Sequence, residues 1–224
     1  QVAEEIQDLI ESQTNPTIAP YAKTGEVHLR VTASAEDEKA CRKLIKPVVK
    51  ELKKRFGENV FATDESKTLE EAVIDLLKEK DLKLSLAESL TGGMIAQRIV
   101  NVSGASEVFG YGFVTYSNKA KHKCLGVKKS TLKEHGAVSA KCAREMAKGA
   151  CKVSGADISI SVTGLAGPGG GTEETPVGTV FMGCCYKGKA IAKEFHFTGN
   201  RMRIREQTTA HALAMLRDCI IMGK

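Results

Sequence analysis

From residue 83 onward, apolar positions alternate between the two-residue period of strands and the three-to-four-residue period of helices. The strand period covers 84–87, 109–115, 158–163, 177–186 and 189–197. The helical period covers 95–102, 139–151 and 201–220. Lys187-Gly188 predicts a hairpin turn between the last two strands. This order predicts a three-layer α/β/α domain in which helices cover both faces of a mixed sheet.

The first part of the chain predicts a smaller α+β domain. We expect a helix over 2–12, extended segments at 17–22 and 27–31, and a returning strand at 58–62. A helical pattern over 41–52 contains Pro47, which should kink or split it. Thr68 begins a capping box, and TDESK before it is the expected linker. The predicted domains are 1–66 and 67–224.

Charge separates the two parts more clearly than composition does. Residues 1–82 carry 13 Lys/Arg against 17 Asp/Glu, whereas 83–224 carry 20 against 10. The basic second part suggests an anionic partner, either a phosphate-bearing small molecule or nucleic acid. The 42% hydrophobic content can fill a core, and no apolar run is long enough to cross a bilayer.

Seven cysteines occur in the chain without any Cys-x-x-Cys spacing. We interpret them as buried free thiols of a reducing compartment, with metal ligation the poorer alternative. The start of the chain is acidic and does not resemble a secretion signal. A cytoplasmic protein is therefore expected. Because the chain lacks an initiator Met, it is expected to be a fragment of a longer protein.

The segment LSLAESLTGGMIA, residues 84–96, predicts a strand that ends in a turn and continues as a helix. Ser89 then lies near a helix N-terminus, where free N–H groups attract anions and oxyanions. Thr91, Gly92 and Gly93 follow it, and glycine allows backbone donors to come close to a ligand. Ser89 is thus a candidate nucleophile. Glu88 either holds a catalytic group or caps the helix.

A serine nucleophile needs a base, and none of the five histidines falls near Ser89 in an obvious pattern. A buried lysine with a lowered pKa can serve instead. Lys119, Lys121 and Lys123 are candidates, although a solvated basic face explains each of them equally simply. Tyr116 either relays the proton or is an ordinary strand aromatic.

Two further features suit a phosphorylated ligand. The loop at 163–179 is rich in glycine and follows a predicted strand, so it either contacts phosphate or ribose or forms a flexible surface turn. It has neither the P-loop nor the dinucleotide-binding spacing. Arg201 and Arg205 share one helix face and suit a phosphate monoester, while a solvated charged turn is the alternative.

Four motifs occur together: AESLTGGMIA (87–96), GFVTYSNKAKHKCLGV (112–127), HGAVS (135–139) and VTGLAGPGGGTEETPVGTV (162–180). In this order they resemble the C-terminal domain of the competence-damage-inducible protein (CinA) family, the nicotinamide mononucleotide deamidases. The resemblance runs from about residue 82 to the C-terminus. Residues 14–62 resemble the small KH-like linker of longer members. Those members carry a further N-terminal domain similar to molybdopterin-binding proteins, and residues 1–224 are not expected to include it.

The resemblance implies hydrolysis of nicotinamide mononucleotide to nicotinate mononucleotide and ammonia, a step of pyridine nucleotide recycling. It implies Ser89 as the nucleophile, with Tyr116 and Lys121 in a Tyr-Ser-Asn-x-x-Lys pattern; Lys121 is preferred to Lys119 as the base by resemblance alone. Asn200 departs from the acidic residue expected there. The implied substrate-binding residues are Thr91, Gly92, Gly93, Asn118, Thr163, Gly164, Gly167, Gly169, Gly170, Arg201 and Arg205. Neither a metal nor a cofactor is implied.

Two other functions stay open on the sequence. One is a non-catalytic nucleotide-binding regulatory or scaffold domain, and the other is an amidase or esterase for a different phosphorylated substrate. The expected partner is a phosphorylated pyridine mononucleotide, with no membrane. An acidic first domain without a Gly-x-x-Gly clamp argues against nucleic acid. Exposed helices on a small α/β domain favour a homo-oligomer.

Overall fold

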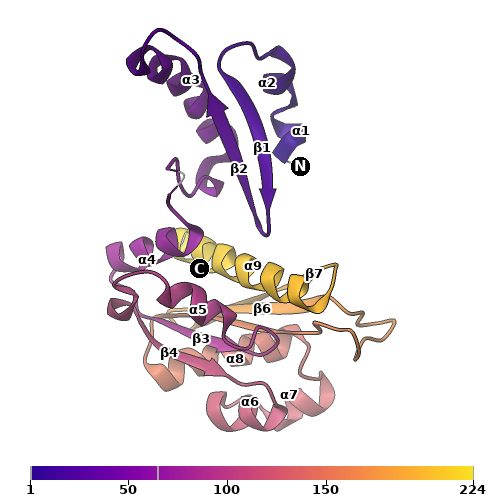
Figure 1. Cartoon of the computed structure of the whole chain (residues 1–224). Helices are drawn as coiled ribbons and strands as arrows, with labels where there is room; N and C mark the ends of the chain where they lie inside the picture. Colours follow the sequence, from indigo (N-terminus) through magenta and orange to yellow (C-terminus); the bar gives the residue numbers. More distant parts are fainter. Residues whose placement is uncertain (1, 65, 224) are drawn as a thin grey trace. The chain divides into compact units, whose positions relative to one another are not determined.

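The computed structural model describes residues 2–64 and 66–223. The chain divides into two compact units, Gln1–Glu65 and Ser66–Lys224 (Figure 1). Within the described residues, no helix is long and apolar enough to cross a membrane.

The first unit is a two-stranded hairpin with helices. Its elements are α1 (Val2–Glu5), α2 (Gln7–Ser12), β1 (Thr17–Lys23), β2 (Glu26–Thr32), α3 (Glu38–Phe56) and a 3-10 turn, η1 (Gly57–Asn59). Strands β1 and β2, which contain the two predicted extended segments, pair in antiparallel fashion. The small core consists of the buried side chains of Ile6, Ile18 and Leu52 with partly buried neighbours.

Two expectations for this unit were wrong, and one alternative of a third is excluded. The first helix is interrupted at Ile6, whose side chain is fully buried in the small core. Of the two effects expected of Pro47, splitting does not occur, because α3 is one helix with Pro47 inside it. No strand forms at 58–62, because Gly57 ends α3 with φ of 52° and leads into η1.

The second unit contains a five-stranded mixed sheet in the order β4-β3-β5-β6-β7. The strands are β3 (Leu84–Glu88), β4 (Phe109–Val114), β5 (Ile158–Gly164), β6 (Thr179–Tyr186) and β7 (Lys189–His196). Strand β3 is parallel to both β4 and β5, whereas β5, β6 and β7 pair in antiparallel fashion. The mixed α/β architecture and the hairpin at Lys187-Gly188 are confirmed.

Helices cover both faces of this sheet (Figure 1). One layer holds α4 (Leu69–Glu79), α5 (Met94–Val100) and α9 (Arg201–Met222). The other holds α6 (Asn118–Leu125), α7 (Lys129–Glu134) and α8 (Ala140–Ser154), and the 3-10 turn η2 (Ala105–Glu107) precedes β4. The capping box predicted at Thr68 is present at the start of α4, and Ser139 caps α8.

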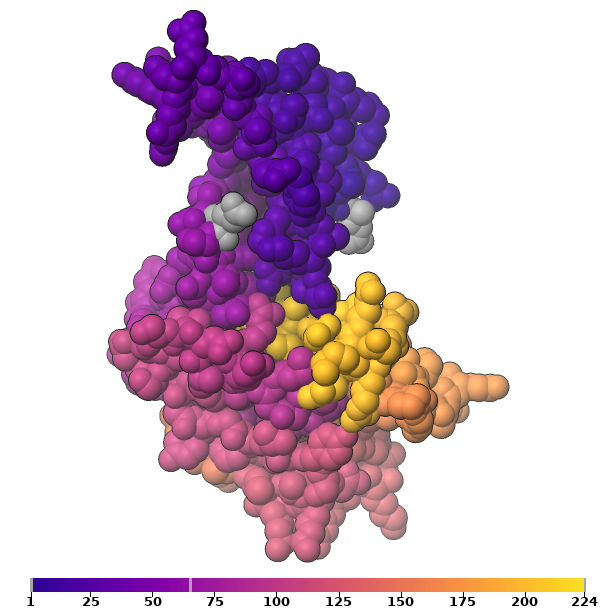
Figure 2. Space-filling view, viewed as in Figure 1, coloured from indigo at the N-terminus to yellow at the C-terminus, as the bar shows by residue number. Residues whose placement is uncertain are grey.

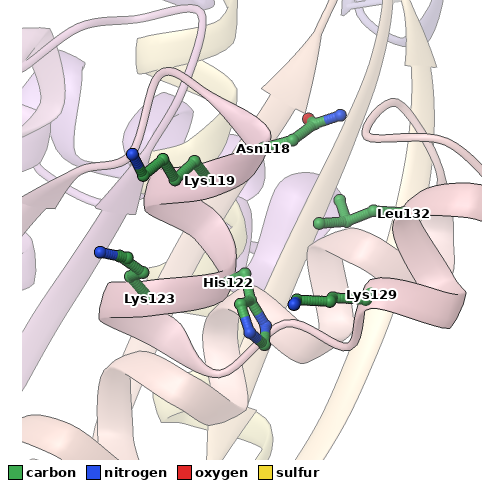
Figure 3. Close-up of a pocket in the computed structure, with 6 residues that line it drawn as sticks. All are labelled: Asn118, Lys119, His122, Lys123, Lys129 and Leu132. Atoms are coloured by element: carbon green, nitrogen blue, oxygen red, sulfur yellow. The ribbon is translucent and has the colours of Figure 1, made fainter.

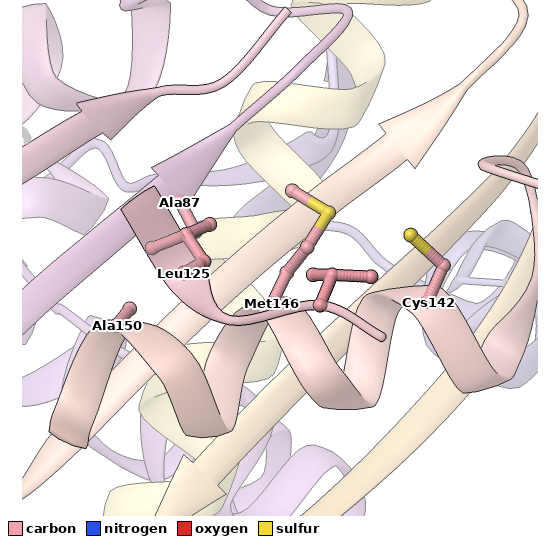
Figure 4. Close-up of a cluster of buried hydrophobic side chains, with 6 residues drawn as sticks. Ala87, Leu125, Cys142, Met146 and Ala150 are labelled. Carbon is pink, nitrogen blue, oxygen red and sulfur yellow. The ribbon is translucent and has the colours of Figure 1, made fainter. Parts of the chain in front are cut away.

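Helix α8 lies very close to the sheet. The hydroxyls of Ser159 and Ser161 on β5 each donate a 2.7 Å hydrogen bond to a carbonyl of α8. At Gly183 on β6, an added Cβ would lie 2.4 Å from the carbonyl oxygen of Ala143. The apolar side chains between these contacts form the cluster of Ala87, Leu125, Val127, Cys142, Met146 and Ala150 (Figure 4). This packing fixes the layer that carries α6.

Candidate active site

Ser89 and Lys121 meet in the interior of the second unit. Ser89 follows the last residue of β3 and is 8% exposed, and Lys121 on α6 is 1% exposed. The distance from Lys121 Nζ to Ser89 Oγ is 2.9 Å, and Nζ also donates to the carbonyl oxygen of Thr115 at 2.8 Å. A fully buried lysine is rare unless it is paired. Here its partners are a hydroxyl and a carbonyl rather than a carboxylate.

The environment of Lys121 favours the neutral amine. Burial lowers the pKa of Lys121, because desolvation penalises the ammonium form. The nearby Cys142 acts in the opposite direction, but burial raises the pKa of its thiol to about 11. Cys142 is therefore an uncharged neighbour at neutral pH. A lysine of this kind can accept a proton from the hydroxyl that it contacts.

Glu88 shapes the turn that follows the nucleophile. Its buried carboxylate accepts hydrogen bonds from the backbone N–H groups of Gly93 at 2.9 Å, Ile95 at 3.2 Å and Ala96 at 2.9 Å. These donors belong to the start of α5, so Glu88 caps the helix. Gly92 and Gly93 take φ of 61° and 102°, values that glycine adopts without strain. Of the two roles expected for Glu88, the structure shows the helix cap.

Two of the expected backbone donors are already used within this turn. The N–H of Gly92 donates to the carbonyl of Ser89 at 3.1 Å, and that of Gly93 donates to Glu88. The N–H groups of Leu90 and Thr91 donate no hydrogen bond within residues 2–64 and 66–223. The donors available beside Ser89 are therefore those of Leu90 and Thr91.

Tyr116 does not join the buried pair. It is 61% exposed, and its hydroxyl accepts a 2.9 Å hydrogen bond from the guanidinium of Arg201. The same guanidinium donates to the carbonyl of Gly167 at 2.7 Å. Tyr116 and the glycine loop are thus joined through Arg201.

Arg205 binds the turn after Ser89. Its Nε donates to the carbonyl of Leu90 at 2.9 Å, and one Nη donates to that of Thr91 at 2.7 Å. The two arginines are one helical turn apart at the start of α9, where Asn200 caps the helix by accepting from the N–H of Arg203. Each guanidinium has five N–H groups, so neither is saturated by these bonds.

The glycine loop has an internal structure and an exposed tip. Thr163 is buried and donates to the carbonyl of Ala137 at 2.8 Å, and a Cβ at Gly164 would lie 2.7 Å from a backbone oxygen. Gly167 takes φ of 73°. Gly169 and Gly170 are exposed, in the loop that projects from the second unit (Figure 2). Packing therefore accounts for the beginning of the loop, and only its tip is free to meet a ligand.

Asn118 lies on a basic pocket between α6 and α7 (Figure 3). The pocket measures about 360 Å³ and is lined by Asn118, Lys119, His122, Lys123, Lys129 and Leu132. His122 Nδ1 lies 2.8 Å from the carbonyl of Val127, which leaves Nε2 for other contacts. Lys121 of the same helix is buried instead.

Two neighbours of the candidate base were not predicted from the sequence. Thr115 supplies the carbonyl bound by Lys121, and Cys142 contributes to its electrostatic environment. Thr115 was visible only as the end of an alternating strand, and nothing in the sequence pointed from Cys142 to Lys121. The expectation that the cysteines are buried was wrong for Cys124, which is exposed, and for Cys41 and Cys151, which are only partly buried. Among the described residues, no three His, Cys, Asp or Glu side chains are placed to hold a metal ion.

Together these features define a class of protein: an α/β/α domain that buries a serine–lysine pair at the carboxyl end of a parallel strand. The family model described as the CinA C-terminal domain matches residues 66–220, and that of the damage-inducible protein CinA KH domain matches residues 1–62. The chain belongs to the CinA family.

Relatives and solved structures agree with this assignment. A Clostridium novyi relative is 50% identical over 220 residues, which cover 98% of this chain and 53% of that protein. A CinA-like protein of Dictyoglomus turgidum is 49% identical over 214 residues, with coverages of 96% and 52%. The chain thus spans about half the length of the curated relatives it matches.

The second unit has the fold of solved CinA proteins. A crystal structure titled as a CinA superfamily protein from Klebsiella pneumoniae has a TM-score of 0.67 at 34% identity, covering 69% of this chain and 96% of that one. Competence/damage inducible protein CihA from Agrobacterium tumefaciens has a TM-score of 0.65 at 42% identity, with coverages of 66% and 91%.

Proposed function

We propose that this chain hydrolyses the carboxamide of nicotinamide mononucleotide to give nicotinate mononucleotide and ammonia. The observation that carries the proposal is the 2.9 Å contact between Ser89 Oγ and Lys121 Nζ in a buried site. A neutral lysine beside a serine hydroxyl is an arrangement suited to acyl transfer. The choice of substrate rests on the resemblance to the nicotinamide mononucleotide deamidases.

In the first step, Lys121 takes the proton of Ser89 while the serine oxygen attacks the carboxamide carbon. The N–H groups of Leu90 and Thr91 are free to bind the oxyanion, and one well-placed donor contributes about 3–4 kcal/mol. Lys121 then protonates the leaving nitrogen, and ammonia departs. Water hydrolyses the acyl-enzyme with Lys121 again as the base, which regenerates Ser89.

The phosphate of the substrate would be bound by the arginines of α9. Arg201 and Arg205 hold the glycine loop and the turn after Ser89, respectively, and each keeps unused N–H donors. A phosphate monoester bound there would lie on the elements that carry the nucleophile. Tyr116, bonded to Arg201, is assigned to this binding role rather than to proton transfer.

The test is ammonia release from nicotinamide mononucleotide by the purified chain, compared with Ser89→Ala, Lys121→Ala and the control Lys123→Ala. We expect Lys121→Ala to lose about 10²–10⁴-fold in kcat, as for removal of a general base, and Ser89→Ala, which removes the nucleophile, to lose at least as much. Lys123 is exposed on the same helix, so its variant should retain turnover. A parent protein that binds the nucleotide but releases no ammonia would refute the proposal. Equal turnover of a phosphorylated amide without a pyridine ring would indicate a different amidase.

A non-catalytic nucleotide-binding domain is the second candidate, and the basic pocket of α6 and α7 favours it (Figure 3). Residues 108–133 contain no Asp or Glu and six lysines, all of them exposed except Lys121, so an anion is attracted to this surface. In that case Lys123→Ala would weaken nucleotide binding, and Ser89→Ala would leave the biological activity intact. Homo-oligomerisation and cytoplasmic location stay predictions.

A further inference from the structure

Thr115, whose carbonyl binds Lys121, has a buried hydroxyl without a hydrogen-bond partner in the described part of the chain. Thr115 is 1% exposed, and its Oγ1 makes no hydrogen bond within the described residues. A buried hydroxyl without a partner lowers stability, so native structures rarely retain one without a reason. Because the carbonyl of Thr115 binds the candidate base, a role in the active site is the reason to consider here.

The backbone places this hydroxyl on the side of the candidate nucleophile. The flanking residues Val114 and Tyr116 are 54% and 61% exposed, so Thr115 alternates with them and points inward. Phe113, two positions earlier, packs against the buried cluster that includes Leu125 of α6 and Met146 of α8. The N–H of Thr115 also donates to the carbonyl of Glu88 at 2.8 Å, directly before Ser89.

The number of N–H groups on Lys121 Nζ changes when the amine takes a proton, and the Thr115 hydroxyl could accept a hydrogen bond from the added one. A neutral amine has two N–H groups and a lone pair, and it gains a third N–H when it takes a proton. In the structure Nζ has two partners, Ser89 Oγ and the carbonyl oxygen of Thr115. Once Ser89 Oγ is bonded to the substrate carbon, the ammonium has three N–H groups for two partner atoms, and a third acceptor would let each N–H have a partner of its own.

We propose that Thr115 Oγ1 accepts the additional hydrogen of Lys121 each time the lysine becomes an ammonium, which makes Thr115 a positioning residue for the base. The carbonyl of the same residue already holds Nζ at 2.8 Å, so the proposed bond adds a second acceptor from one residue. No covalent bond of Thr115 changes: the proton travels from Ser89 Oγ to Nζ and then to the leaving nitrogen. This inference rests on the proposed function.

Thr115→Val tests the inference, because valine keeps the shape and removes only the hydroxyl. We expect kcat to fall by about tenfold or more, which is part of the 10²–10⁴-fold that a general base contributes, with KM unchanged. An acceptor favours the charged form, so its loss lowers the pKa of Lys121 and moves the acid limb of the kcat/KM profile to lower pH. Thr115→Ser restores the acceptor and should recover most of kcat.

If Thr115 had a purely structural role, Thr115→Val would unfold at a lower urea concentration than the parent. We expect it instead to unfold at the same or a higher urea concentration, because it removes an unpartnered buried hydroxyl. The matched control is Ser85→Ala, which removes another such hydroxyl at the far end of β3 and should leave kcat and the pH profile unchanged. Parental kcat and pH profile in Thr115→Val would overturn the inference.

Failure of the inference can be distinguished from failure of the proposed function. If the parent releases no ammonia, the deamidase proposal fails, and Thr115 is tested by titrating Lys121 in protein with isotope-labelled lysine by NMR. A lower pKa for Lys121 in Thr115→Val than in the parent supports the hydrogen bond. An unchanged pKa overturns it.

Discussion

Replacing Glu88 by alanine should weaken both the second unit and its candidate site. The carboxylate accepts three backbone N–H groups at 2.9, 3.2 and 2.9 Å and is 1% exposed. A hydrogen bond to a charged group contributes about 1.5–3 kcal/mol, and removal of the acceptor leaves buried donors unpaired. The three bonds share one acceptor, so we take the low end and expect a loss of about 4 kcal/mol. That is a large share of the roughly 5–15 kcal/mol that stabilises a typical domain.

The assay is urea unfolding followed by far-UV circular dichroism, together with turnover at low urea. Glu88→Gln keeps one oxygen acceptor and should lose about half as much stability as Glu88→Ala. The matched control is Glu145→Ala. Its carboxylate accepts from the N–H of Lys128 at 2.8 Å and the hydroxyl of Thr131 at 2.7 Å, at the start of α7.

Stability and activity should separate in this comparison. Loss of two bonds at the partly exposed Glu145 should cost about 1–2 kcal/mol with normal turnover. Glu88→Ala should lose turnover even where it is folded, because Gly93 and the turn after Ser89 lose their anchor. A stability loss below about 1 kcal/mol in Glu88→Ala, or full turnover in the folded variant, would refute the reasoning.

Three further predictions follow from burial and backbone geometry. Lys121→Met should stabilise the chain at pH 6 more than at pH 10, because a lowered folded-state pKa penalises the protein as pH falls below the unfolded value; urea unfolding at both pH values tests this. Cys124 should react with iodoacetamide at pH 8 in the folded protein, and Cys142 only after unfolding, as peptide mapping would show. Gly178→Ala should cost more than about 2 kcal/mol, because its Cβ would lie 1.9 Å from a backbone oxygen, whereas Gly169→Ala meets open space and should be neutral by thermal unfolding.

The strands and helix starts of the second unit were predictable because their signals are local. Ser139 at the start of α8 and the box at Thr68 are satisfied by residues three positions away, so the sequence contains both partners. The prediction of a strand at 58–62, which was wrong, shows the limit of such local signals. The apolar residues there fit a strand, but the pairing that would confirm a strand is not a local property.

Burial of polar side chains was harder to predict. The alternation along β5 predicts one apolar and one polar face, yet every residue from Ile158 to Thr163 is buried. The polar face meets α8, where Ser159 and Ser161 donate to helix carbonyls. Lys121 is a similar case: composition and spacing could not distinguish it from Lys119, because only the packing of α6 decides which lysine is buried.

The arginines of α9 explain why no single motif defined the site. Both were interpreted from the sequence as phosphate ligands, and the structure shows that both also hold backbone carbonyls. Arg205 binds the turn after Ser89, and Arg201 binds the glycine loop and Tyr116. One helix turn thereby holds segments that are distant in sequence. Arg201 and Tyr116 are 85 residues apart, and Arg205 and Leu90 are 115 residues apart. A site held in this way is preorganised, since binding of a phosphate would not have to order the loops first.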